Sequence, residues 1–183
     1  MEKHYLSAQD LLVDSFSLAV KIYESGFRPT LIIGVWRGGT PIAIAVQEYF
    51  EYQGIKTDHI AIRASSYTGI NQQSRDIQIN GLEYIFEHTG IHEPLLIIDD
   101  VFDSGRSIEA ILRQLEIKSK RNIAETVKVA CPWYKPNNNK TRLKPDFYLH
   151  ETDAWLVFPH ELVGLTEEEI KTGKKEISKI LGQ

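Results

Sequence analysis

The stretch at residues 95–107, LLIIDDVFDSGRS, constrains the fold of this chain more than any other stretch. It opens with an apolar run, continues into the adjacent acids Asp99 and Asp100, and then offers Asp103 and a turn of serine and glycine. A short apolar run that ends in a turn indicates a strand buried on both faces. Apolar residues at helical spacing follow over 108–115. The stretch therefore predicts a strand, a turn and a helix, which is the repeating unit of a parallel α/β sheet.

The same alternation of strand and helix runs through the chain. Apolar runs at 29–35, 59–64 and 126–131 predict further strands, and helical periodicity predicts helices over 11–23 and 41–54. With 183 residues, of which 42% are hydrophobic and 25% charged, the composition is that of one globular domain. We expect an α/β fold with a doubly wound, mainly parallel central sheet and helices on both faces.

The ends of two helices carry their own signals. Ser7 and Asp10 have the spacing of a capping box and predict the start of the first helix, which Gly26 is expected to end. The charged segment at 166–181 has apolar residues on one side and predicts a single terminal helix.

A long polar segment at 65–76 interrupts the alternation. Loops of this length in compact domains are usually either lids over a site or disordered segments. The dipeptide Asn80-Gly81 then separates two apolar runs, 77–79 and 82–86, which predicts a β-hairpin at the base of the loop. The alternative is a plain surface excursion.

Charge and cysteine content exclude several classes of protein. A formal net charge of −4 gives no electrostatic reason to expect nucleic acid or an anionic membrane as partner. The single cysteine, Cys131, excludes an internal disulfide and fits a reducing compartment. No apolar run is long enough to span a bilayer, and the first residues lack the pattern of a signal peptide. We therefore expect a cytoplasmic protein.

Acidic side chains stand where the central strand ends. In a sheet of this kind ligands bind at the carboxyl ends of the strands. Asp99 and Asp100 alternate across the strand, so that one can face a cleft and the other a structural partner. Carboxylates accept hydrogen bonds from sugar hydroxyls and can bind Mg²⁺, although simple solvation at a strand end is the alternative. Asp103, at the start of the turn, is placed to take a proton from a bound base.

Two further strand tips suit a phosphorylated substrate. Residues 104–107 stand at a helix start, where free backbone amides and the positive helix end form an anion site; the alternative is an ordinary helix cap. Arg37 beside Gly38 and Gly39 joins a cation to a flexible backbone, which suits pyrophosphate. Its alternative is a left-handed turn with a surface arginine.

These motifs, in this order and spacing, resemble those of the type I phosphoribosyltransferases over roughly residues 30–160. Residues 95–107 match that family's signature for 5-phosphoribosyl 1-diphosphate (PRPP), residues 37–39 resemble its pyrophosphate loop, and residues 65–67 resemble the start of its flexible catalytic loop. The resemblance implies Mg²⁺ as cofactor. The roles that it implies are ribose binding and a Mg²⁺ contact, direct or through water, for Asp99 and Asp100; general base near purine N7 for Asp103; 5′-phosphate binding for Ser104, Gly105, Arg106 and Ser107; pyrophosphate binding for Arg37 and Gly38; and closure over the reaction for Ser66 and Tyr67.

Two later residues resemble those of the branch that acts on 6-oxopurines. Lys135 resembles the lysine that bonds purine O6, with a solvated strand end as its alternative. Trp155 resembles the aromatic residue that stacks on the purine ring, with a core tryptophan as its alternative. Two residues depart from the family pattern, namely Arg106 in the phosphate turn and the bulky Trp36 beside the pyrophosphate loop. The resemblance leaves open whether the peptide bond between Trp36 and Arg37 is cis.

The resemblance as a whole implies a purine salvage enzyme. It would transfer the phosphoribosyl group from PRPP to N9 of hypoxanthine or guanine, with xanthine as a further candidate, and release pyrophosphate. A transferase for another base and a PRPP-sensing regulator without catalysis are the alternatives. The resemblance also implies a homodimer or homotetramer. We expect a single domain over residues 1–183, with a small hood built from the N-terminal segment, the region around 133–165, or both.

Overall fold

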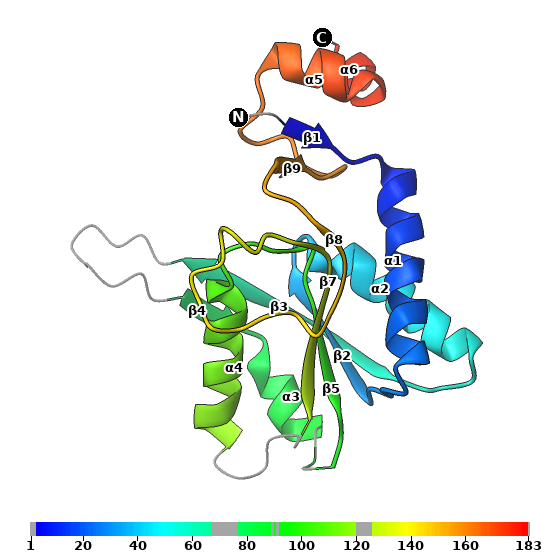
Figure 1. Ribbon diagram of the computed structural model, residues 1–183, viewed down its shortest axis with the longest axis vertical. Coiled ribbons are helices and arrows are strands. Elements are labelled where there is room, and N and C mark those ends of the chain that lie inside the picture. Colours follow the sequence, from blue (N-terminus) through cyan, green and yellow to red (C-terminus); the bar gives the residue numbers. More distant parts are fainter. Residues whose placement is uncertain (1–2, 67–76, 89, 91, 120–125, 183) are drawn as a thin grey trace, which may run out of the picture. The chain divides into compact units, whose positions relative to one another are not determined.

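The computed structural model describes residues 3–66, 77–88, 90, 92–119 and 126–182 (Figure 1). The chain divides into two compact units, each of which is described on its own. The large unit spans Leu12–Asp153, and the small unit joins Met1–Leu11 to Ala154–Gln183. Among the described residues, no helix is long and apolar enough to cross a membrane.

The large unit is built on a sheet in which neighbouring strands are far apart in the sequence. In spatial order its strands are β4 (Ile77–Asn80), β3 (Asp58–Ser66), β2 (Leu31–Trp36), β5 (Leu95–Ile98), β7 (Val127–Tyr134) and β6 (Val101–Phe102), and β8 (Phe147–Glu151) also pairs with β7. Each of these pairings is parallel except that of β3 with β4. The predicted mainly parallel sheet is therefore confirmed.

Helices cover both faces of this sheet. Figure 1 shows α1 (Ala8–Glu24) and α2 (Gly39–Tyr52) on one face, and α3 (Leu82–His88) and α4 (Arg106–Ser119) on the other. Ile108, Ile111 and Leu115 of α4 pack in one buried cluster with residues of β2, β3, β5 and β7. The doubly wound arrangement predicted from the sequence is confirmed.

The central strand β5 lies inside these layers. Its four residues, Leu95 to Ile98, are at most 1% exposed. Burying one such side chain fully stabilises a fold by about 1.5–3 kcal/mol. The apolar run thus fixes the middle of the sheet, and the acids that follow it emerge at the strand's carboxyl end.

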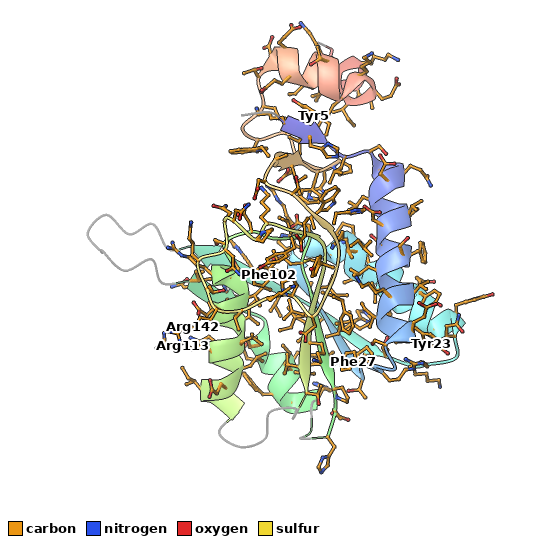
Figure 2. The ribbon with its side chains drawn as sticks, viewed as in Figure 1. Tyr5, Tyr23, Phe27, Phe102, Arg113 and Arg142 are labelled. Atoms are coloured by element: carbon orange, nitrogen blue, oxygen red, sulfur yellow. The ribbon has the colours of Figure 1, made fainter. Side chains whose placement is uncertain are left out.

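The first helix begins and ends where its signals predict. In the first turn of α1, the Asp10 amide donates at 3.0 Å to Oγ of Ser7, the residue just before the helix. Gly26 follows the helix with φ = +84°, a conformation that favours glycine. Tyr23, near the end of α1, meets Phe50 of α2 edge to face, with ring centroids 6.0 Å apart (Figure 2).

The hairpin predicted around Asn80-Gly81 is wrong in its second half. Residues 82–86 lie in helix α3. β4, which ends at Asn80, pairs instead with the preceding strand, β3. The helix forms because Leu82 and Ile85, one turn apart, are both buried against the sheet. Tertiary burial therefore decides the structure of this short apolar run, which fits either period.

The small unit contains β1 (Lys3–Tyr5), which pairs in parallel with β9 (Trp155–Val157), and two short helices. These helices, α5 (Glu167–Gly173) and α6 (Lys175–Leu181), replace the single terminal helix predicted over 166–181, which is wrong. The break is at Lys174, which is 9% exposed and whose ammonium donates to the carbonyls of Phe158 and Pro159 at 2.6 and 3.0 Å. The backbone of Lys174 is not helical, with φ = −137°, and its side chain points inward to these carbonyls.

Candidate active site

The tips of four strands meet at one edge of the large sheet. Because β2, β5, β7 and β6 are neighbours and run parallel, their carboxyl ends lie side by side. Residues 37–39 follow β2, Asp99 and Asp100 follow β5, the turn at 103–105 follows β6, and Lys135 follows β7. The structure thus brings together the motifs that lie up to a hundred residues apart in the chain.

The acidic pair after β5 is held by the backbone of its own turn. Asp99 Oδ1 accepts from the Asp100 amide at 3.0 Å, and Asp100 Oδ1 accepts from the Val101 amide at 2.8 Å. The Asp99 amide donates to the Ala130 carbonyl of β7 at 3.1 Å. Burial, followed by the charge of the adjacent Asp100, raises the pKa of Asp99 well above its usual range. Both causes disfavour the charged form of this carboxyl, and a cation bound beside it would favour that form.

The glycines after β2 lie directly against this acidic pair and the end of β5. A Cβ atom at Gly38 would overlap the Asp100 carboxylate, and a Cβ atom at Gly39 would overlap the Ile98 carbonyl. Both positions therefore need glycine for close approach. The peptide bond between Trp36 and Arg37 is cis, and both side chains are exposed. The backbone of Gly38 and Gly39 thus stands directly beside Asp99 and Asp100.

The turn after β6 encloses a small cavity at the start of α4. The cavity has a volume of about 60 Å³ and is lined by Asp99, Val101, Phe102, Asp103, Ser104, Gly105, Ser107 and Ile108. The first amides of a helix have no partner within the helix and point out of its start. Serine hydroxyls and helix amides at one cavity form a site for an anion. Arg106 opens α4 with an exposed side chain, outside the lining of this cavity.

Gly105 is required for the shape of this turn. Its φ of +75° lies in the left-handed region, and a Cβ atom there would come within 2.6 Å of Thr141 Oγ1 and 2.8 Å of Phe102 Cε1. Phe102, labelled in Figure 2, is one of the residues that line the cavity. The turn is therefore packed tightly against the segment that follows β7.

Lys135 and Asp103 form an ion pair at the mouth of the site. Lys135 Nζ lies 3.4 Å from Asp103 Oδ2, and the lysine side chain is 12% exposed whereas that of the aspartate is 40% exposed. The Lys135 amide also donates to the Phe102 carbonyl at 2.9 Å, next to Asp103 in the chain. Two residues that the sequence places in different motifs thus present a donor and an acceptor side by side.

A family profile described as phosphoribosyl transferase domain matches residues 3–162. The chain belongs to this family. The resemblance found in residues 37–39, 65–67 and 95–107 is therefore confirmed as kinship.

Relatives of this phosphoribosyltransferase cover nearly its whole length. It is 26% identical over 176 residues to the hypoxanthine-guanine phosphoribosyltransferase of Lactococcus lactis, which covers 92% of this chain and 85% of that protein. The solved structure of a purine phosphoribosyltransferase from Pyrococcus horikoshii is 29% identical, with a TM-score of 0.71 over 91% of this chain and 99% of that one. A Helicobacter pylori xanthine-guanine-hypoxanthine phosphoribosyltransferase has the same fold, with 21% identity and a TM-score of 0.69 over 97% and 99% of the two chains.

The structure places two further predicted site residues, Ser66 and Trp155, in strands. Ser66 ends β3 and pairs with Ile77 of β4, and Tyr67 lies outside the described residues. Trp155 begins β9 in the small unit and is 53% exposed, so the alternative of a core tryptophan is wrong. Cys131 is fully buried in β7, where burial raises the pKa of its thiol.

The segment after Lys135 is a part of the site that the sequence did not reveal. Asn138 Nδ2 donates a hydrogen bond to Asp103 Oδ1. The Lys140 amide donates to the Ser104 carbonyl at 2.9 Å. From the sequence alone, residues 137–140 are an ordinary polar loop, and the one signal for a role in the site is that this asparagine run closely follows a strand tip.

The acidic pair fits the Mg²⁺ ion that the family implies. Mg²⁺ keeps several waters and binds through one or two carboxylates together with substrate phosphates. Asp99 and Asp100 supply two carboxylates side by side at the end of β5. In the described part of the chain, no cluster of three or more histidine, cysteine, aspartate or glutamate side chains forms a metal site by itself. The pair therefore suits an ion that arrives with its substrate.

Proposed function

We propose that this phosphoribosyltransferase is a purine salvage enzyme that transfers the 5-phosphoribosyl group of PRPP to N9 of a 6-oxopurine. Hypoxanthine and guanine are the proposed acceptors, with xanthine as a further candidate. The proposal rests on the purine-specific names of its relatives and on one feature of the site, the pairing of Lys135 with Asp103.

The Lys135–Asp103 pair matches one edge of a 6-oxopurine. On that edge O6 accepts hydrogen bonds and N7 stands next to it, whereas adenine presents an amino donor in place of O6. An ammonium group has donors only, and an ionised carboxylate has acceptors only. Lys135 can therefore donate to O6 while Asp103 accepts from a protonated N7. Against adenine the lysine would face another donor, which leaves two donors without acceptors.

The remaining groups are assigned to PRPP. Ser104, Gly105, Arg106, Ser107 and the first amides of α4 are proposed to bind the 5′-phosphate, with Arg106 outside the cavity acting at longer range. Asp99 and Asp100 are proposed to hold the ribose hydroxyls and the Mg²⁺ ion. Arg37 and the Gly38 backbone are proposed to hold pyrophosphate. A bound Mg²⁺ would supply positive charge at the departing pyrophosphate.

The chemical step is a displacement at C1′ of the ribose. The lone pair of purine N9 forms the new bond to C1′, while the bond from C1′ to the pyrophosphate oxygen breaks and its electron pair leaves with pyrophosphate. The proton at N7 moves to the Asp103 carboxylate, and the electrons of the N–H bond stay in the ring. A positioned general base of this kind accelerates a reaction by about 10²–10⁴-fold. Arg37 acts on the other side of C1′, where negative charge develops on the leaving group.

Several parts of the proposal rest on the sequence and the family resemblance alone. Closure by Ser66 and Tyr67, stacking of Trp155 on the purine, the hood, assembly into a homodimer or homotetramer, and a cytoplasmic location all stay predictions. A closing segment is expected in this chemistry because water in the site would hydrolyse PRPP.

One assay with a panel of bases tests the proposal. Pyrophosphate release is measured with PRPP, Mg²⁺ and, in turn, hypoxanthine, guanine, xanthine, adenine and uracil. We expect release with one or more of the three 6-oxopurines and little with adenine or uracil. Release with adenine or uracil alone would point to a transferase for another base. PRPP binding without release with any base would point instead to a PRPP-sensing regulator.

A further inference from the structure

Both oxygens of the Asp103 carboxylate contact side chains of the segment that follows β7. Oδ1 accepts a hydrogen bond from Asn138 Nδ2, and Oδ2 faces Lys135 Nζ at 3.4 Å. The two partners are three residues apart on one turn, since the Asn138 amide donates to the Lys135 carbonyl at 3.2 Å. The proposed base is therefore held from one side by an uncharged amide and from the other by the lysine proposed to bind the purine.

The hydrogen-bonding groups of Asn138 and Asp103 determine how the two side chains meet. An ionised carboxylate only accepts hydrogen bonds, so the asparagine must present its NH₂ group and not its carbonyl oxygen. A hydrogen bond to a charged group is shorter and stronger than one between neutral groups. By occupying Oδ1, Asn138 sets the rotation of the carboxyl group and turns Oδ2 toward Lys135. Oδ2 is then the oxygen that points to the proton of a purine bound at Lys135.

The main chain holds Asn138 at this place. The Lys135 amide donates to the Phe102 carbonyl at 2.9 Å, and the Lys140 amide donates to the Ser104 carbonyl at 2.9 Å. These two bonds fasten the segment on either side of Asn138 to the residues on either side of Asp103. The distance between the amide and the carboxylate is thus set by backbone contacts rather than by a flexible loop.

We propose that Asn138 is a positioning residue for the reaction, which orients the Asp103 carboxylate toward N7 of the purine. This inference rests on the proposed function, because it takes Asp103 as the general base. Asn138 acts through Asp103 and does not itself touch the reacting atoms. Its loss should lower turnover and leave PRPP binding almost unchanged.

The competing explanation is that Asn138 only holds its own loop in place. Asn137 provides a matched control for this explanation. It precedes Asn138 in the same turn and also ties the segment to a carboxylate, since its Nδ2 donates to Asp153 Oδ2 at 2.7 Å. Asn137→Ala therefore removes a similar anchor without touching Asp103.

The test compares kcat and the KM for PRPP in Asn138→Ala, Asn138→Asp and Asn137→Ala, using the full chain with the most active 6-oxopurine. We expect Asn138→Ala to lower kcat about ten-fold, which corresponds to about 1.4 kcal/mol of lost transition-state stabilisation, with the KM for PRPP within about two-fold. Asn138→Asp should be slower still, because it places a like charge against Asp103. Asn137→Ala should keep the kcat of the unmodified protein. Equal losses in Asn137→Ala and Asn138→Ala, or a normal kcat in Asn138→Ala, would overturn the inference.

A double substitution separates positioning from loop stability. In an Asp103→Asn background, the change Asn138→Ala should lower kcat no further, because the group that it orients is already gone. An additional ten-fold loss there would refute the inference. The failure of the proposed function has a different signature, since the unmodified protein would then release no pyrophosphate with any 6-oxopurine, or Asp103→Asn would be fully active.

Discussion

The loop after β2 packs directly against the end of β5. Gly39, in this loop, is therefore a position where one added methyl group should strongly lower the stability of the fold. A Cβ atom there would overlap the Ile98 carbonyl and stand 2.8 Å from the Asp99 Cα atom. Both are main-chain atoms of the central strand and its end, so no side chain can rotate to make room. Gly39→Ala must therefore displace β5 or the start of α2.

The size of the effect follows from the kind of atom that must move. Forcing an extra methyl group into a well-packed interior costs typically about 1–3 kcal/mol, and the backbone contacts at Gly39 place it at the upper end of that range. For a chain of this size, each kcal/mol lowers the melting temperature by about 2–4 °C. We therefore expect Gly39→Ala to melt about 6–12 °C below the unmodified protein.

Thermal unfolding followed by circular dichroism measures this difference, with two other glycines as controls. At Gly90 an added Cβ atom would stand 3.8 Å from Glu93 Oε2, an ordinary contact, so Gly90→Ala should melt no lower than the unmodified protein. At Gly34 the Cβ atom would stand 3.1 Å from that of Ala43, so Gly34→Ala should fall between the two. A melting temperature of Gly39→Ala within 2 °C of that of Gly90→Ala would refute the reasoning, since it would mean that the loops are not in backbone contact (about 1 kcal/mol or less).

Three further substitutions test individual side chains. Asp103→Asn should lower turnover by about 10²–10⁴-fold while PRPP still binds, and unchanged turnover would remove Asp103 from the role of base. Trp155→Ala should weaken purine binding far more than PRPP binding in calorimetric titrations, whereas equal losses would indicate a structural tryptophan. Asp99→Asn, measured by urea unfolding with EDTA and without PRPP, should be more stable than the unmodified protein at neutral pH. Because burial and Asp100 raise the folded-state pKa of Asp99 above its unfolded value of about 3.9, the folded state binds the extra proton between the two values. The stability of the unmodified protein therefore falls as pH rises through this window, and the advantage of Asp99→Asn should grow from pH 4 upward and then level off; an advantage that is the same at all pH values would contradict this cause.

The sequence predicts the framework of the site because each part of it obeys a local rule. The run before Asp99 is too apolar to lie anywhere but inside the sheet, and Gly105 stands where a turn needs a left-handed residue. Parallel strands then place their tips together without further information. The pairing of Lys135 with Asp103 is a product of this rule, since β6 and β7 are neighbours.

What the sequence does not predict depends on contacts between distant residues. The break at Lys174 arises because its ammonium reaches two carbonyls in another segment, and nothing in the local pattern of 166–181 indicates it. The helix at 82–88 depends on which face of a short apolar run the sheet buries. Asn138 looks like any polar loop residue until the fold brings it to Asp103, which is 35 positions earlier.

The segment from Lys135 to Lys140 is hydrogen-bonded at both of its ends to the main-chain carbonyls of residues 102 and 104. Main-chain hydrogen bonds do not depend on which side chain a residue carries. The segment can therefore keep its place when a side chain between these two anchors, such as that of Asn137, is replaced. In an evolving or engineered enzyme, position 137 can therefore vary without rebuilding the turn that is proposed to bind the 5′-phosphate, whereas position 138 is constrained by its bond to Asp103.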